Sequence, residues 1–327
     1  MGPLFGICVG RALDAEWVRQ GRPDPFVVVE AGAGNGRLAR EVLRSEPACS
    51  PALHYVLVER SEVLRAEQTL KLPIEPQSDV LGPGRVEPGE DAPVPVDGLG
   101  PIVSALDALP ARPVDGVVLA NELLDNLAFE IVVRTDAGWS EVRVGLEGER
   151  CVEVLVPAAD DLLRWVSAVD APVGTRLPVA AEMVEWIVRA AACLRRGAVV
   201  VLDYVADWSE LVARDGGWLR TYAGHERGHD PLVDPGSRDI TADVPLEMVL
   251  RAAHRAGLTA VGTNRQAEWL RDLGIDELVA AGAAAWQAGA ASPDLAAIVG
   301  RSRGTEAAVL TASPGLGAHT VLTFTKP

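Results

Sequence analysis

Several features that would place this chain in other protein classes are scarce or missing. Only 4 cysteines occur among 327 residues, and none of them form a C-x-x-C pair or a cluster with histidine. We therefore predict reduced thiols and no metal site. The sequence contains no apolar run of about 18 residues, so we expect no membrane span, and its N-terminal apolar run is too short for a signal peptide. These absences together indicate the cytoplasm.

Positive charge and aromatic residues are also in short supply. The 30 Lys and Arg residues stand against 46 Asp and Glu, which gives a formal net charge of -16. A negative field repels phosphate backbones, which argues against nucleic acid as the main partner, whereas it attracts a basic protein segment. Aromatic residues make up 5% of the chain, so aliphatic side chains must fill the core.

What the sequence does contain is a succession of short apolar runs separated by helical stretches. Alternating strands and helices predict an α/β fold with a parallel sheet and crossover helices. The predicted helices cover residues 4–17, 37–44, 61–72, 178–194, 241–256 and 269–312. Gly197 is predicted to end the fourth of these helices. The predicted strands cover residues 26–30, 54–59, 101–103, 115–120, 198–204 and 319–325.

This succession changes between Phe129 and Val156, where apolar and polar residues alternate on either side of two turn sequences, at residues 136–138 and 147–149. Alternation around such turns is typical of antiparallel hairpins. We therefore predict a small β-hairpin insertion over residues 129–175. It divides one domain into a first part, 1–128, and a remainder, 176–327, which holds a long polar loop at 205–240. Long loops in compact domains are usually functional or disordered.

A glycine-rich segment follows the first predicted strand and precedes a predicted helix. Glycine lets the chain turn sharply and lets a ligand approach the backbone, and a helix start offers free N–H groups. A dinucleotide fingerprint needs G-x-G-x-x-G, whereas the spacing here is G-x-G-x-G with an acid before it. That pattern is typical of class I methyltransferases, which bind S-adenosyl-L-methionine, although a tight turn without a ligand is the alternative. The predicted cofactor contacts are Glu30, Gly32, Ala33, Gly34 and Gly36.

Further cofactor contacts are predicted at the ends of the second and third strands. Glu59 lies 23 residues after Gly36, and a carboxylate there can accept hydrogen bonds from both ribose hydroxyls of an adenosine. Leu106 and Asp107 follow the third strand, where an adenine ring would be held. For Asp107, capping the next turn is an equal alternative.

The fourth strand ends in a polar segment, Asn121-Glu122-Leu123-Leu124-Asp125. Ligands of open α/β sheets bind at this edge, so Asn121 is predicted to contact the cofactor. Glu122 and Asp125 are candidate catalytic residues, because paired carboxylates hold a planar, permanently cationic guanidinium best. For Asp125, simply closing a helical turn with Asn126 is an equal alternative.

These segments resemble the MidA-like methyltransferases, whose mitochondrial member is a complex I assembly factor that methylates arginine. The resemblance spans nearly the whole chain. The matching segments are Pro3–Gly6, Glu30–Gly36, Asn121–Asn126, Leu202-Asp203-Tyr204, Tyr222-Ala223-Gly224-His225, Asp230-Pro231-Leu232, Asp234-Pro235-Gly236 and Asp239-Ile240-Thr241-Ala242.

The resemblance implies a Rossmann-like class I methyltransferase sheet, mostly parallel with an antiparallel last strand, and a helical C-terminal region. It implies S-adenosyl-L-methionine as cofactor and N-methylation of an arginine in a partner protein. The segment 205–240 would shape the substrate side, and His225 is a candidate for proton removal or substrate binding, with loop packing as its alternative.

The chain also departs from the family pattern at three places. Ala33 replaces a loop proline, Ala223 replaces an arginine, and the family's helical region before Pro3 is missing. The last departure motivates a rival hypothesis, a non-catalytic, cofactor-binding assembly or docking protein. An NAD(P)-dependent oxidoreductase is a second rival, which the loop spacing disfavours. The oligomeric state stays open, with a homodimer among the candidates.

Overall fold

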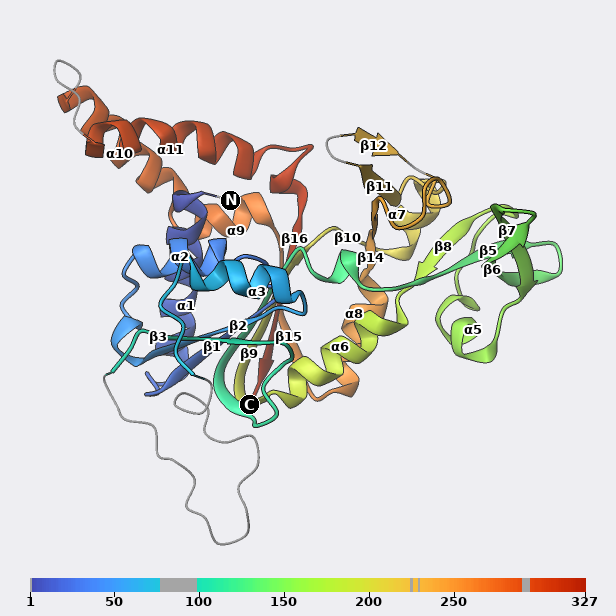
Figure 1. Cartoon of the computed structure of the whole chain (residues 1–327), viewed down its shortest axis with the longest axis horizontal. Coiled ribbons are helices and arrows are strands. Elements are labelled where there is room, and N and C mark those ends of the chain that lie inside the picture. The colour runs from blue at the N-terminus through green and yellow to red at the C-terminus, as the bar shows by residue number, and fades with distance from the viewer. Residues whose placement is uncertain (1, 77–98, 224–225, 229, 290–294) are drawn as a thin grey trace, which may run out of the picture. The chain divides into compact units, whose positions relative to one another are not determined.

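The computed structural model describes residues 2–76, 99–223, 226–228, 230–289 and 295–327. The chain forms two compact units (Figure 1). The first unit comprises Met1–Asn121, Arg189–Leu202 and Gly257–Pro327, and the second comprises Glu122–Val188 and Asp203–Ala256. The predicted insertion, 129–175, belongs to the second unit together with the segments that flank it and with the predicted loop 205–240.

The first unit is built on a seven-stranded sheet in the order β15-β16-β9-β4-β1-β2-β3. The β1–β2, β2–β3, β1–β4 and β4–β9 pairs are parallel, whereas β15 and β16 are antiparallel. The predicted sheet, mostly parallel with an antiparallel last strand, is confirmed. Its strands are β1 (Phe26–Ala31), β2 (Leu53–Val58), β3 (Ile102–Leu106), β4 (Val114–Asn121), β9 (Leu194–Asp203), β15 (Thr259–Arg265) and β16 (Thr320–Lys326).

The centre of this sheet is buried on both faces, as parallel sheets covered by helices are. Every residue of β1 is buried, and its β-branched run suits a pleated, enclosed strand. On one face, Leu4 and Phe5 of α1 (Pro3–Arg19) pack in one cluster with Phe26 and Val28 of β1. Other helices of this unit are α2 (Arg37–Arg44), α3 (Glu62–Thr69), α9 (Gln266–Asp272), α10 (Ile275–Gly289) and α11 (Leu295–Thr311), with the 3-10 turns η1 (Ser50–Ala52) and η3 (Leu316–Ala318).

Two glycines fix how closely β1, β4 and β9 approach one another. A Cβ atom on Gly116 of β4 would lie 1.8 Å from the carbonyl oxygen of Val27, and one on Gly197 of β9 would lie 1.9 Å from that of Gly116. Only glycine fits at either position. The prediction that Gly197 ends a helix is therefore wrong, and the strand begins at Leu194 rather than at Ala198.

The C-terminal helices α9 to α11 confirm the predicted helical segment 269–312, although the strand β15 just before them was not predicted. Its residues are half-exposed to exposed, so the apolar run that marks a buried strand is absent from the sequence. Among the residues described, no helix combines the length and the apolar character needed to cross a membrane.

The second unit begins with the predicted hairpins. Its four-stranded antiparallel sheet has the order β7-β6-β5-β8, with turns at the two predicted positions. The helix predicted from Pro178 begins at Ala181, because residues 176–179 instead pair with β5. The elements are β5 (Glu130–Thr135), β6 (Gly138–Glu147), β7 (Arg150–Pro157), α5 (Asp160–Val166), β8 (Arg176–Val179) and α6 (Ala181–Ala192), whose last residues belong to the first unit.

The prediction of one long loop over 205–240 is wrong. Asp207 caps α7, because its Oδ1 accepts a hydrogen bond from the N–H of Glu210 at 2.8 Å, and Leu219–Ala223 pairs with two short strands. The helix predicted from Thr241 begins later, since residues 239–242 form one of those strands. The elements are β10 (Val205–Ala206), α7 (Trp208–Ala213), β11 (Leu219–Ala223), β12 (Glu226–Gly228), β13 (Asp239–Ala242), β14 (Val244–Pro245) and α8 (Leu246–Arg255). His225 lies outside the described residues.

Candidate functional site

The strand register of the first unit places the predicted cofactor residues at one edge of the sheet. Ala31 at the end of β1 pairs with Val58 and with Ala120, and Val58 pairs in turn with Leu106. Strands β1, β2 and β3 end at these residues, and β4 ends one residue after Ala120. The residues that follow them are Gly32, Glu59, Asn121 and Asp107, so this carboxyl edge of the parallel strands is the candidate cofactor site, as in other open α/β sheets.

The glycine loop adopts backbone conformations that favour glycine. Gly32, Gly34 and Gly36 have φ angles of 70°, 53° and 76°, which an L-residue with a side chain adopts only at a cost. A Cβ atom on Gly34 would meet no atom of the described residues within 4 Å. The loop therefore exposes bare backbone to open space at Gly34, while the neighbouring Ala33 is buried.

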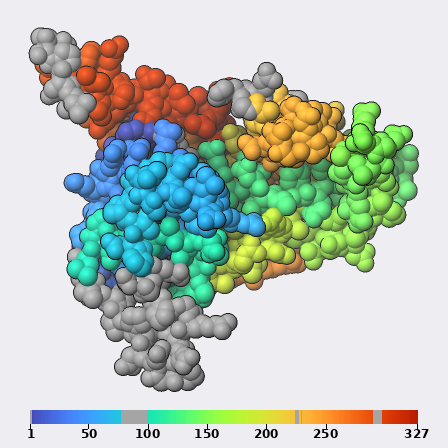
Figure 2. Space-filling model, in the orientation of Figure 1, coloured from blue at the N-terminus to red at the C-terminus, as the bar shows by residue number. Residues whose placement is uncertain are grey.

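The backbone of Gly34 is held on both sides by side chains. Its N–H donates to Oε2 of Glu59 at 2.9 Å, and its carbonyl oxygen accepts from Nε2 of Gln68 at 2.6 Å. The other Glu59 oxygen accepts from the N–H of Ser61 at 2.8 Å. Gln68 lies on α3, in the light-blue part of the first unit, next to the darker blue N-terminal part (Figure 2).

These residues fit S-adenosyl-L-methionine. The open backbone at Gly34 lets a ligand approach the main chain. Each oxygen of Glu59 accepts one backbone N–H and keeps a second lone-pair direction for a ribose hydroxyl. Leu106 is buried at the strand end and Asp107 beside it is exposed. The strand end therefore offers an apolar and a polar side chain that an adenine ring could contact.

Glu30 lies in a different environment from the rest of the predicted cofactor set. Its side chain is 4% exposed, and its Oε2 accepts a hydrogen bond from the Tyr55 hydroxyl at 2.8 Å. Burial raises the pKa of the Glu30 carboxyl to about 7, against which the bond from Tyr55 acts. Glu30 therefore links β1 to β2 inside the first unit, and its contact with the cofactor stays a prediction.

The two predicted catalytic carboxylates that the structure describes lie in the second unit, around the 3-10 turn η2 (Leu124–Asn126). Glu122, two residues before it, has a φ of 51°, a left-handed conformation that costs a non-glycine residue about 1 kcal/mol. The turn is held by Asp203, which is fully buried. Its Oδ2 accepts from the N–H of Leu124 at 2.7 Å, and its Oδ1 accepts from that of Tyr204 at 2.8 Å.

Asp125 is buried beside Asp203 and is not an open surface carboxylate. Its side chain is 4% exposed, its Oδ1 accepts from the Asn126 amide at 2.7 Å, and its carboxyl is hydrogen-bonded to that of Asp203. Burial first, and then the charge of Glu122, raises the pKa of Asp125 to about 6. Burial and the neighbouring Asp125 likewise raise the pKa of Asp203 well above its ordinary value. Two such carboxyls share a proton.

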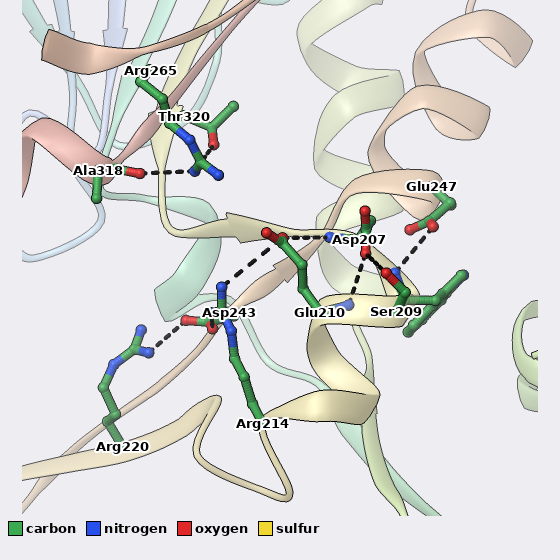
Figure 3. A network of polar contacts seen from close by, with 11 residues as sticks. Asp207, Ser209, Glu210, Arg214, Arg220, Asp243, Glu247, Arg265, Ala318 and Thr320 are labelled. Carbon is green, nitrogen blue, oxygen red and sulfur yellow. Dashed lines mark hydrogen bonds and ion pairs between the residues drawn. The ribbon is translucent and has the colours of Figure 1, made fainter. Parts of the chain in front are cut away.

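A buried guanidinium group balances these acids. Arg220 lies over the ring of Tyr204, with 4.7 Å between its Cζ atom and the ring centroid, and it forms an ion pair with Asp243. Asp243 is itself buried and lies between Arg220 and Arg214 (Figure 3). The acid cluster, by which we mean Glu122, Asp125, Asp203, Tyr204, Arg220 and Asp243, thus holds a guanidinium by ring stacking and carboxylate pairing.

Gln68, Asp203 and Arg220 were not predicted from the sequence. No sequence signal marks Gln68, because the pattern of a predicted helix does not show which of its polar residues contacts a loop elsewhere in the chain. Asp203 and Arg220 gave a weak signal, because Asp203 belongs to one of the matched motifs and Arg220 lies two residues before another. In the described part of the chain, no three His, Cys, Asp or Glu side chains gather in a way that could hold a metal ion.

Comparison with known proteins places this geometry in a family. A family model described as "Putative S-adenosyl-L-methionine-dependent methyltransferase" matches residues 8–264. A Burkholderia thailandensis protein crystallised with S-adenosyl-homocysteine is 26% identical, with a TM-score of 0.80 over 99% of this chain and 77% of that chain. This neighbour confirms the predicted class I methyltransferase fold.

Curated relatives point to the same family. The chain is 28% identical over 290 residues to the human protein arginine methyltransferase NDUFAF7, mitochondrial, and 27% identical over 299 residues to its mouse counterpart. Each match covers 84% of this chain, and the chain spans 62% of the length of each relative. Since the family model covers well over half of the residues, the chain belongs to the family of S-adenosyl-L-methionine-dependent methyltransferases.

Proposed function

We propose that the protein transfers the methyl group of S-adenosyl-L-methionine to a side-chain nitrogen of an arginine in a partner protein. The observation that carries this proposal is the glycine loop at the carboxyl edge of the sheet, with open backbone at Gly34 and with Glu59 bonded to its N–H. The cofactor supplies the reactive methyl group, and the protein supplies binding and orientation.

The roles of the chain's own residues divide between its two units. In the first unit, Gly34 and Glu59 bind the cofactor, with Asn121 at the same edge of the sheet. In the second unit, Glu122 binds the N–H groups of the acceptor guanidinium and orients it, because a carboxylate and a guanidinium match in charge and in geometry. Asp125 contributes by fixing, through Asp203, the turn that follows Glu122. Orientation of this kind supplies a large part of a transfer reaction's rate.

Arginine as the acceptor has two lines of support. The curated relatives carry the name protein arginine methyltransferase. Independently, the acid cluster already accommodates the guanidinium of Arg220 on the ring of Tyr204, so its chemistry suits that group. A basic segment of a partner protein would also be attracted by the net charge of -16.

We also propose that residues 205–240, with His225, shape the substrate side, and that the protein works in the cytoplasm. The relatives are named as mitochondrial proteins, so fractionation of the source cells is the direct test of the compartment. Measuring the mass of the purified protein in solution tests whether it forms a homodimer.

Titration calorimetry of the full chain with S-adenosyl-L-methionine, S-adenosyl-homocysteine and NADH tests the cofactor. Incubation with methyl-labelled cofactor and Arg-containing peptides, with Lys-substituted peptides as controls, tests the acceptor. We expect micromolar binding of both adenosyl ligands and label only on arginine. Tight NADH binding would instead favour an oxidoreductase, and binding without any transfer would favour a non-catalytic assembly protein.

A further inference from the structure

The β2–α3 segment contains a buried glutamine that contacts the glycine loop. Gln68 has 0% exposure and is the residue of α3 that is buried, whereas the rest of that helix is at least partly exposed. Its Nε2 atom donates to the carbonyl oxygen of Gly34 at 2.6 Å. Its Oε1 atom is buried without a hydrogen-bond partner in the described part of the chain.

This contact completes the restraint on one peptide segment. Glycine at a φ of 53° has no side chain to limit its rotation, so its orientation depends on what its N–H and carbonyl groups bind. Glu59 holds the N–H and Gln68 holds the carbonyl. The Gly34 carbonyl oxygen can only accept a hydrogen bond, so it needs a donor such as the buried amide N–H of Gln68.

Neighbouring contacts tie the same helix to the loop. A Cβ atom on Gly36 would lie 3.0 Å from Cδ1 of Leu72 and 3.4 Å from Cγ of Gln68, so the loop lies directly against this region. The Asn35 amide also donates to Glu67 of α3 at 3.3 Å. The loop is therefore shaped from the α3 side while its Gly34 face stays open.

We infer that Gln68 is a positioning residue for the cofactor, which it does not itself need to contact: by holding the Gly34 carbonyl it sets the direction of the loop's backbone groups and thereby the affinity for the adenosyl ligand. This inference rests on the proposed cofactor site. It assigns to α3 a part of the affinity that the glycines alone do not provide, since preorganisation of a loop lowers the cost of binding.

The test compares Gln68 with Gln20, which is a close match within the same unit. Gln20 is also buried, its Nε2 donates to a backbone carbonyl, that of Gly116 at 3.1 Å, and its Oε1 is likewise buried without a partner in the described residues. We would measure the affinity of S-adenosyl-homocysteine for the full chain and for Gln68→Met and Gln20→Met, with melting temperatures in parallel. We expect about tenfold weaker binding for Gln68→Met and wild-type affinity for Gln20→Met, with similar losses of melting temperature.

A second variant separates a positioning role from general damage. In Gln68→Glu an ionised carboxylate faces the Gly34 carbonyl and repels it, whereas a protonated carboxyl donates to it as the amide does. We therefore expect the affinity of Gln68→Glu, relative to wild type, to rise as the pH falls. Equal affinity in wild type and both Gln68 variants at all pH values would overturn the inference. Failure of the wild type itself to bind would instead overturn the proposed cofactor site.

Discussion

The glycine loop of the first unit and the acid cluster of the second unit are held in opposite ways. The loop is held through its main chain, since Glu59 and Gln68 bind the N–H and carbonyl of Gly34. The acid cluster is held through side chains, most clearly by Asp203, which binds a turn 79 positions away along the chain. Substitutions in the loop should therefore act on ligand binding, while those in the cluster should act on stability as well.

The largest effect is expected from Gly34→Val. Valine at a φ of 53° costs about 1–2 kcal/mol of backbone strain, and its side chain fills the open space at Gly34 that a ligand would use. We expect the affinity for S-adenosyl-homocysteine, measured by titration calorimetry, to fall by about 1000-fold, or roughly 4 kcal/mol.

Gly257→Val is the matched control for the loop. Gly257 has a φ of 77°, and a Cβ atom there would likewise meet none of the described atoms within 4 Å, yet it lies away from the carboxyl edge of the sheet. The control should show a comparable drop in melting temperature and wild-type affinity. If both variants lost affinity equally, strain alone would explain the result and the site would not be at Gly34.

The next largest effect is expected from Glu122→Gln. The amide keeps the size of the carboxylate but removes the charge that pairs with a guanidinium, so we expect kcat to fall by about 100-fold, or roughly 3 kcal/mol. Affinity for S-adenosyl-homocysteine should stay within a factor of about two, because Glu122 is not among the proposed cofactor contacts. Glu147→Gln, at an exposed hairpin turn of the same unit, should leave both quantities unchanged. Undiminished turnover in Glu122→Gln would remove the proposed role.

The contrast between the two regions also explains how far the sequence could be interpreted. The parallel strands of the sheet, the glycine loop and Glu59 follow from local order, because β-branched runs, glycines and an acid at a strand end each reflect the local structure. Strand register then brings Gly32, Glu59 and Asn121 to one edge without further information.

The environments of Glu30, Asp125 and Arg220 could not be predicted in this way. Each depends on a residue far along the chain, namely Tyr55, Asp203 and Asp243, and periodicity carries no record of such pairs. The same reason explains why the prediction of a loop over 205–240 is wrong, since the strands of this segment are short and become stable only by pairing with one another.

A smaller loss, in stability, is expected from Asp203→Ala. The variant leaves the buried N–H of Leu124 and the partly buried N–H of Tyr204 without their acceptor, which costs about 2–3 kcal/mol. Asp203→Asn should cost less, because the amide oxygen still accepts one N–H and the amide nitrogen can donate to Asp125 in place of the shared proton. Urea denaturation followed by circular dichroism measures both. Asp207→Ala, which removes a half-exposed cap of α7, should cost only about 1 kcal/mol.

An effect smaller than that of Asp203→Ala is expected from Glu30, a buried acid in the first unit. It shows whether burial raises the pKa of a carboxyl in this unit as it does in the acid cluster. Its pKa is about 7 in the folded protein against an ordinary value of 4.5. Between pH 4.5 and pH 7, Glu30 therefore keeps its proton in the folded state but loses it in the unfolded state. The stability from this group is complete below pH 4.5 and is lost as the pH rises through 7. Between pH 5 and pH 7, wild type should lose about 2 kcal/mol relative to Glu30→Gln. Tyr55→Phe removes the hydrogen bond that lowers the pKa of Glu30, so the loss of stability in this variant should extend to higher pH. If the stability of wild type and of Glu30→Gln changed with pH in the same way, burial would not govern the pKa of this carboxyl.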